Sequence, residues 1–352
     1  MSIYNRELVK HVKQIEKLLL IIVVISVLAI LKLLSFVFVP LVAAALISFI
    51  FMPFVRRSVK RNVSNWITMP LVLLILFAFL GFLVLLVQIS TREFVGVDVQ
   101  FWYDSLERVN SMLSPLLDML GFEHLSRSNI TNYIQNNAEL TRKMYAILGT
   151  ILDFTQRTLI MLAMTLFYVV LFLSGSINMR NIMQAAIFKR ATPATRTFLI
   201  LEKSLGKFLT VKFLISLTTG IAASVSCVAF NIKFPIFWGV LVFVLNFIQL
   251  FGSIVSTTAV SLFALSQIDN TGTVFAFIGL IIAIQIVFGS ILEPIFMGKA
   301  FSINTITILI MLMFWGYMWG IIGLILSVPI TVVFKTVLSQ SGRYKIISDL
   351  ME

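Results

Sequence analysis

The sequence predicts an all-α, polytopic integral membrane protein with about eight transmembrane segments. Hydrophobic residues make up 59% of the 352 residues and charged residues only 12%, so the chain carries more apolar surface than a soluble domain could bury. Charge-free windows long enough to cross about 30 Å of hydrocarbon also recur along the chain. These windows lack the alternation of polar and apolar residues that marks a membrane β-barrel, so each is expected to be helical.

The N-terminal windows predict a pair of helices. The first, Leu18–Leu31, continues past Lys32 to Val39, and the second is Leu33–Val55. Lys32 can turn toward a partner helix or a polar cavity, so it need not end the span. We expect the pair to turn near Pro40. The first helix is expected to remain in the mature protein, because its apolar run is too long for a cleavable signal peptide.

The later windows predict single spans and two hairpins. They are Trp66–Thr91, Thr158–Met179, Phe213–Ile232, Phe234–Ile268, Thr273–Ile291 and Ile303–Phe334. Phe234–Ile268 is long enough for two short helices and has polar residues at its centre, so it forms either two crossings or a re-entrant hairpin. Ile303–Phe334 is too long for one ordinary crossing, and we expect a hairpin broken around residues 315–320.

The positions of the basic residues predict the sidedness of the chain. The net charge is +12, but the basic residues cluster in short loops, so the lipid bilayer is the expected partner and nucleic acid is not. The clusters are Arg6, Lys10, Lys13 and Lys17 before the first helix, the RRSVKR stretch at 56–61, and Arg180, Lys189, Arg190, Arg196, Lys203 and Lys207 in one connection. The positive-inside pattern places these loops and both termini in the cytoplasm.

Four regions follow from the spans and charges. Residues 1–91 form an N-terminal membrane hairpin, a basic cytoplasmic loop and a third span. Residues 92–146 lean acidic and carry apolar positions at helical spacing, which predicts a small extracytoplasmic helical subdomain. It packs on its own membrane domain or a neighbouring protomer, or captures substrate. Residues 147–207 form a span and a basic cytoplasmic loop, and residues 208–352 form a transport core with hairpins and a cytoplasmic tail.

The residues that soluble enzymes and ATP-driven pumps need are scarce. His11 and His124 are the only histidines, and neither can easily join a buried catalytic triad or a metal cluster. Cys227 is the single cysteine, which excludes an intrachain disulfide and a cysteine-based metal site. The sequence also has no phosphate-binding GxxxxGK[ST] motif. We therefore expect no enzymatic activity, no cofactor and no metal site.

Polar residues inside the window 240–266 predict the transport site. They are Asn246, Gln249, Gly252, Ser253, Ser256, Thr257 and Thr258. Amides and hydroxyls in hydrocarbon must be satisfied by other helices, exposed backbone or water. A polar tip containing glycine between two short apolar arms is typical of a discontinuous helix at a transport site. The alternative is a set of interhelical hydrogen bonds that never meet substrate.

A carboxylate stands at the end of the window 273–291. Pro294 removes a backbone donor and disfavours helical geometry at the residue before it, so the helix is expected to loosen or end at Glu293, near the cytoplasmic face. Glu293 either forms a salt bridge with Lys299 or a loop lysine, or takes part in gating or in protonation coupled to transport.

Glycines and prolines in the C-terminal region are candidate hinge or packing positions. They are Pro294, Gly298, Gly316, Gly320, Gly323 and Pro329. Gly316 and Gly320 have the small-xxx-small spacing of closely packed membrane helices. Close packing and a flexible hinge are both compatible with this spacing.

The C-terminal half resembles the autoinducer-2 exporter family of bacterial membrane proteins. The resemblance rests on LNFIQLFGS at 245–253, ILEPIFMGKAFSI at 291–303 and FWGYMWGIIGLILSVPITVVFK at 314–335, in that order and spacing. It implies a multi-pass transporter of the bacterial inner (plasma) membrane that assembles as a homo-oligomer. Three positions depart from the family pattern, since Gln249, Ser253 and Thr305 stand where proline is common. Substrate identity is therefore the property that transfers least.

The leading hypothesis is export of a small polar solute, with Asn246, Gln249 and the Ser/Thr cluster supplying neutral hydrogen bonds. Members of the family are associated with export of autoinducer-2, a small hydrophilic signal, and others with exchange of sodium or lithium for protons. An antiporter needs buried carboxylates, and the only candidates are Glu293 and Asp153. A third hypothesis is a non-transporting membrane scaffold whose subdomain 92–146 binds a partner.

Overall fold

The computed structural model describes residues 3–61, 63–95, 101, 105, 107–108, 160–174, 193–249, 251–297, 303–340 and 350–351. These ranges are helical apart from short connections and contain no β-strand, which confirms the all-α prediction. The helices are α1 (Ile3–Leu33), α2 (Ser35–Lys60), α3 (Asn65–Val95), the helix Ile160–Ser174, α9 (Pro193–Ala229), α10 (Pro235–Leu245), α11 (Phe251–Leu265), α12 (Thr271–Gln285), the π-helix η2 (Ile286–Leu292), α13 (Glu293–Met297) and α14 (Thr305–Gln340).

Six stretches of the described helices are long and apolar enough to cross a membrane. They are Gln14–Leu33, Ser35–Val55, Trp66–Ser90, Phe198–Ala229, Thr271–Met297 and Thr305–Ser339. Three shorter apolar helices accompany them, namely Ile160–Ser174, α10 and α11. The chain is therefore polytopic, as the sequence predicts.

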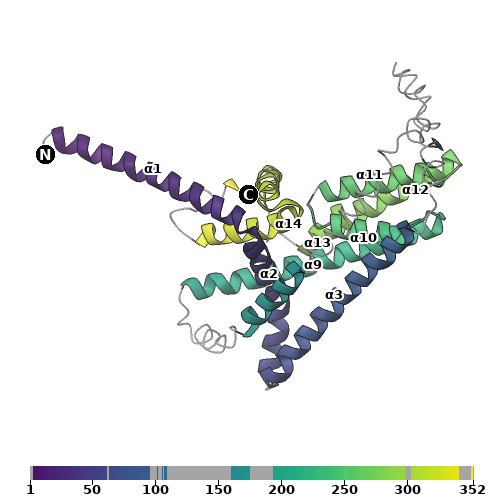
Figure 1. Ribbon diagram of the computed structural model, residues 1–352, viewed down its shortest axis with the longest axis horizontal. Helices are drawn as coiled ribbons and strands as arrows, with labels where there is room; N and C mark the ends of the chain where they lie inside the picture. The colour runs from purple at the N-terminus through teal and green to yellow at the C-terminus, as the bar shows by residue number, and fades with distance from the viewer. Residues whose placement is uncertain are drawn as a thin grey trace, which may run out of the picture.

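The N-terminal pair turns earlier than expected. The break between α1 and α2 is at Leu34, and Pro40 lies inside α2. Proline removes one backbone hydrogen bond from a helix, and α2 accepts that loss without ending. In Figure 1, α1 extends away from the other helices. Its C-terminal end is attached to α14, because the Trp319 indole N–H donates to the Leu31 carbonyl at 3.1 Å and the Lys32 ammonium lies 3.5 Å from the centre of the Tyr317 ring.

Helix α9 begins at Pro193, so the described part of the basic connection, from there to Lys207, is helical. After α9 the chain reverses, and α10 runs back along it (Figure 1). Gly220 and Gly239 face each other across this contact, since a Cβ atom built on Gly220 would lie 2.7 Å from the Gly239 carbonyl oxygen. The two glycines let the helix backbones approach closely, as small residues do in membrane interfaces.

The window 234–268 forms two short helices, α10 and α11, and residues 246–249 lie in the connection between them. With 11 and 15 residues at about 1.5 Å per residue, each helix is shorter than the roughly 30 Å of a hydrocarbon core. At their junction, a Cβ atom on Gly252 would overlap the Leu245 carbonyl oxygen. These lengths favour the re-entrant alternative over two full crossings.

Helix α14 is broken at Trp319 and Gly320, where Gly320 has φ +62° and ψ −143°. The rings of Trp315 and Phe334 lie 6.4 Å apart, although 19 residues of straight helix would separate them by about 28 Å. Helix α14 is therefore a hairpin, and its break lies in the predicted 315–320 region. A Cβ atom on Gly323 would overlap the Trp315 carbonyl oxygen, so close packing is required there.

Most of the segment 92–146 lies outside the described residues, as do His124, Asp153, Gly298 and Lys299. The described residues of the segment 92–146 contact two turns between the membrane helices. The Arg108 guanidinium lies 3.0 Å from the Asp269 carboxylate, and the Phe101 ring lies 6.0 Å from the Phe234 ring. This part of the segment therefore packs on its own chain, next to the α9–α10 and α11–α12 turns.

Candidate functional site

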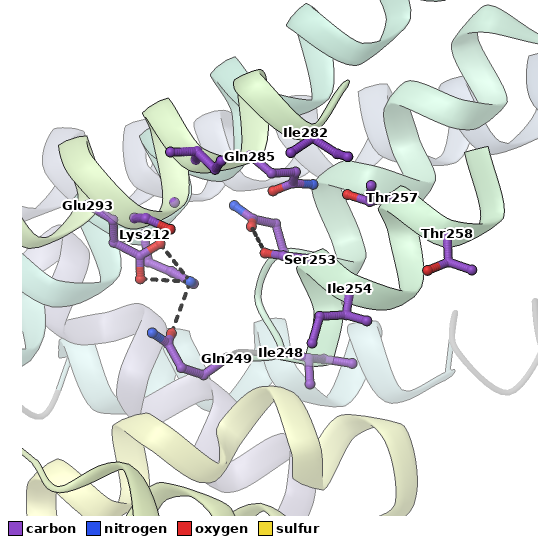
Figure 2. A pocket seen from close by; sticks show the side chains of 14 residues that line it. Lys212, Ile248, Gln249, Ser253, Ile254, Thr257, Thr258, Ile282, Gln285 and Glu293 are labelled. Atoms are coloured by element: carbon purple, nitrogen blue, oxygen red, sulfur yellow. Dashed lines mark hydrogen bonds and ion pairs between the residues drawn. The ribbon is translucent and has the colours of Figure 1, made fainter. Parts of the chain in front are cut away.

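A buried ion pair joins three elements that are far apart in the sequence. The Lys212 ammonium, on α9, lies 2.8 Å and 2.9 Å from the two carboxylate oxygens of Glu293, at the start of α13. It also donates to the Gln249 side-chain oxygen at 3.1 Å, in the tip between α10 and α11. An ammonium group has three protons, so each proton of the Lys212 ammonium has one of these three oxygens as its acceptor. Figure 2 shows this arrangement.

The π-helix η2 explains how Glu293 reaches this position. Pro294 cannot donate a hydrogen bond to the Ser290 carbonyl, and its ring would clash with that group in a regular α-helix. The wider turn of η2 accommodates the proline, and the Glu293 N–H donates instead to Phe288, five residues earlier. π-Helical turns inside α-helices are frequent at functional sites. The predicted loosening of the helix before Pro294 therefore takes the form of a π-helix.

A second polar cluster lies beside the ion pair. The Asn246 amide nitrogen donates to the Ser216 hydroxyl at 3.1 Å, and the Ser253 hydroxyl lies 3.4 Å from the Asn246 amide oxygen. Deeper in the fold, the Gln285 amide nitrogen donates to the Ser256 hydroxyl at 3.2 Å. These bonds connect α9, the hairpin tip, α11 and α12 through side chains that carry no charge.

The two clusters line one cavity with a volume of about 440 Å³, within the usual range of small-molecule sites. Its lining residues come from α9, the hairpin tip, α11, α12 and η2 (Figure 2). They are Lys212, Asn246, Ile248, Gln249, Ser253, Ile254, Thr257, Thr258, Ile282, Gln285, Ile286, Gly289, Ser290 and Glu293. The only charges among them belong to Lys212 and Glu293, which neutralise each other.

The structure brings together most of the site residues predicted from sequence. Asn246, Gln249, Ser253, Thr257 and Glu293 line the cavity. Two other predicted residues lie beside it without lining it. Ser256 is fully buried and holds Gln285, and Gly252 makes the tight contact with Leu245 that closes the tip. Pro294 directly follows Glu293, whereas the predicted hinge and packing positions Gly316, Gly320, Gly323 and Pro329 do not line the cavity, and Gly298 lies outside the described residues.

Sequence reasoning missed the partner of Glu293. Lys299 or a loop lysine was the expected salt-bridge partner, but Lys212 lies within the candidate span Phe198–Ala229 and its side chain is 5% exposed. A signal was present in the sequence, because Lys212 shares one helical face with the buried residues Leu205, Phe208 and Ser216. Lys203 and Lys207, by contrast, are exposed. Gln285 was also missed, because the prediction depended on a cluster of polar residues and Gln285 is a single one within its window.

Comparisons with known proteins agree with this architecture. The sequence model of the protein family described as AI-2E family transporter matches residues 19–342 of this chain. A provisionally named transport protein of Borreliella burgdorferi is 30% identical over 230 residues, which cover 63% of this chain and 62% of that protein. The AI-2 transport protein TqsA of Escherichia coli is 26% identical over 330 residues, covering 90% of this chain and 89% of the relative.

A third relative, from Haemophilus influenzae, also has only a provisional transport name. It is 29% identical over 317 residues, which cover 88% of each chain. Because the family model matches nearly the whole chain, including every element that lines the cavity, this multi-pass membrane protein belongs to the AI-2E family of transporters.

Proposed function

We propose that this protein exports a small, neutral, polar solute of the autoinducer-2 type across the bacterial inner membrane. The observation that carries the proposal is the cavity of about 440 Å³ beside the α10–α11 tip. Its lining offers amides and hydroxyls to a solute, together with one internally neutralised ion pair. A net-charged ligand would find no uncompensated counter-charge among these residues. The name of the Escherichia coli relative supports autoinducer-2 as the first solute to test.

The ion pair gives the hairpin tip a fixed position. Lys212 bonds to the tip through Gln249 and to the start of α13 through Glu293. A transporter must open the same site to each side in turn, and discontinuous helices commonly form such sites. We propose that the tip moves relative to α12 and η2 during transport, and that the Lys212 bonds hold it in the conformation described here.

A sodium or lithium exchanger for protons is the second candidate. Its support is the buried carboxylate of Glu293, the only acidic side chain among the described residues that line the cavity. A monovalent cation would have to replace the Lys212 ammonium, which already occupies both carboxylate oxygens. This competition favours the neutral solute. A membrane scaffold without transport activity is the third candidate, and it gives the cavity no role.

Family membership and the distribution of charge support two further features of the proposal. We infer that the protein works as a homo-oligomer, with the exposed apolar surface of α1 available to lipid or to a neighbouring protomer. We also infer that both termini lie in the cytoplasm, because the basic loops follow the positive-inside rule.

Flux measurements in liposomes separate the three candidates. Purified protein is reconstituted, and autoinducer-2 efflux and sodium-driven proton movement are measured separately for the wild type and Glu293→Gln. The proposal predicts efflux by the wild type and a loss of efflux in the variant. Sodium-driven proton flux that disappears in Glu293→Gln would support the exchanger. No flux of either kind under any imposed gradient would favour the scaffold.

A further inference from the structure

Gln285 has a polar group that no part of the described protein satisfies. It is the last residue of α12, its side chain is nine-tenths buried, and it lines the same cavity as Gln249 and Ser253. Its amide nitrogen donates to the Ser256 hydroxyl, but its amide oxygen is buried and has no hydrogen-bond partner. Figure 2 shows Gln285 and Ser253 as neighbouring residues in the lining of this cavity.

The hydrogen bonds of Ser256 fix which end of the amide is free. A glutamine amide can be reversed without changing its shape, so the orientation must come from its partners. The Ser256 hydroxyl donates its single proton to the Ser253 carbonyl at 3.2 Å. Its oxygen can therefore only accept from Gln285, which requires the amide nitrogen on that side. The amide oxygen then lies on the opposite side.

A buried acceptor without a donor costs free energy, and buried polar side-chain atoms usually have a partner. We propose that movement of the α10–α11 tip during transport uncovers the Gln285 amide oxygen, which then accepts a hydrogen bond from a hydroxyl group of the solute, and that Gln285 is therefore a specificity-determining residue. This inference rests on the proposed transport function and makes it more specific. Ser256 is a positioning residue, because it acts on the solute only through the Gln285 amide.

The chemistry of an acceptor restricts the solute. A carbonyl oxygen accepts protons and gives none, so it attracts a hydroxyl and disfavours a carboxylate or phosphate. The amide nitrogens of Asn246 and Gln249, which line the same cavity, can donate to solute oxygens. The site thus fits a neutral molecule with several hydroxyl groups. Sites built to bond a substrate hydroxyl reject analogues that lack it, so a deoxygenated analogue is the informative probe.

The test combines one variant with one change in the solute. Gln285→Met keeps an unbranched side chain of similar length and removes the acceptor. Gln267→Met is the matched control, because Gln267 lies beyond the end of α11 and its amide contacts Ser105 rather than the cavity. KM for efflux is measured with autoinducer-2 and with analogues that each lack one hydroxyl. As a separate measurement of binding, the rise in melting temperature of the purified protein is recorded when each solute is added.

For the wild type, removal of the hydroxyl that meets Gln285 is expected to raise KM about tenfold, the effect of one lost hydrogen bond. In Gln285→Met the KM for autoinducer-2 should rise by the same factor, and the deoxygenated analogue should lose no further affinity. The control variant should behave as the wild type. The inference would be overturned if each analogue raised KM relative to autoinducer-2 by the same factor in Gln285→Met as in the wild type, even with transport intact.

The binding measurement separates this inference from the proposed function. Stabilisation of the wild type by autoinducer-2 without any flux would overturn the transport proposal, and the same comparison of analogues on melting temperature would still decide the role of Gln285. Flux that Gln285→Met leaves unchanged would overturn the inference alone. A wild type that neither binds nor moves the solute would overturn both.

Discussion

Lys212 has three ammonium protons and three acceptors within hydrogen-bond distance, two on Glu293 and one on Gln249. A lone charge in the bilayer interior is costly, and intramembrane charges usually pair with one another. Because the pair is complete, loss of one member leaves the other buried without its counter-charge. The site is therefore more sensitive to single substitutions than to the loss of both charges.

The ion pair gives the first prediction. Lys212→Met and Glu293→Gln should each lower the free energy of unfolding by about 3 kcal/mol or more and abolish solute efflux. The double variant Lys212→Met/Glu293→Gln should unfold at a higher temperature than Lys212→Met, because it leaves no unpaired charge. Thermal unfolding followed by tryptophan fluorescence measures all three, with the exposed-lysine variant Lys207→Met as control. Additive losses in the double variant would show that the two charges are not coupled.

At the scale of elements, short-range steric rules in the sequence locate the break in α14 and the loosening before Pro294, but not the bend between α1 and α2. The WGYMWG stretch predicted the break in α14, and Pro294 predicted the loosening that η2 provides. The turn expected at Pro40 was wrong, since α2 continues through that proline and the chain bends at Leu34. No local pattern at Leu34 marks this bend, and it depends on how α1 and α2 pack.

Gly252 gives the second prediction. A methyl group on this residue would overlap the Leu245 carbonyl oxygen, and backbone cannot move aside as a flexible side chain can. Gly252→Ala should therefore force the α10–α11 tip open and cost about 1–3 kcal/mol of stability. Gly289→Ala is the control, because nothing lies within 4 Å of a Cβ atom there although Gly289 also lines the cavity. The expected result is lower efflux and a lower melting temperature for Gly252→Ala only.

The break in α14 gives the third prediction. Gly320 has a positive φ that residues with a Cβ atom rarely adopt, while no neighbouring atom would touch that Cβ. Gly320→Ala should therefore lower stability by about 1–3 kcal/mol through backbone strain alone. Gly279→Ala, in the middle of α12 and equally open, should not lower it. Equal melting temperatures for Gly320→Ala and the wild type would mean that the hairpin does not need this backbone conformation.

The residues of the candidate site, like the bends of the helices, were predicted only in part from the sequence. Asn246, Gln249 and Ser253 were identifiable because they belong to a cluster of amides and hydroxyls between two apolar arms. Lys212 was overlooked despite its place on an otherwise apolar helix face, because it borders a group of basic residues that the positive-inside rule assigns to a loop. Its pairing with Glu293 joins positions 81 residues apart, and that distance is set by how α9 packs against α13 rather than by any local pattern.

At the scale of the whole molecule, the α9–α10 and α11–α12 turns share one end of the fold. Phe101 contacts Phe234 in the α9–α10 turn, and Arg108 contacts Asp269 in the α11–α12 turn. Both turns therefore lie on the side of the segment 92–146, whose charge predicts an extracytoplasmic position. The α10–α11 tip lies beside Lys212, which precedes the end of α9 by 17 residues, about 26 Å of helix.

These positions give a final prediction, on the depth of the tip. In a Cys227→Ala background, Thr271→Cys should react with a membrane-impermeant maleimide of any size added from outside, because Thr271 is exposed at the outer turn. Ser253→Cys lines the cavity, so it should react with a small methanethiosulfonate and be protected by autoinducer-2. It should resist a bulky polyethylene-glycol maleimide, because a re-entrant tip is enclosed by α9, α12 and η2. Two full crossings would instead place the tip in bulk water, and the bulky reagent would then label Ser253→Cys from the cytoplasmic side as readily as the small one.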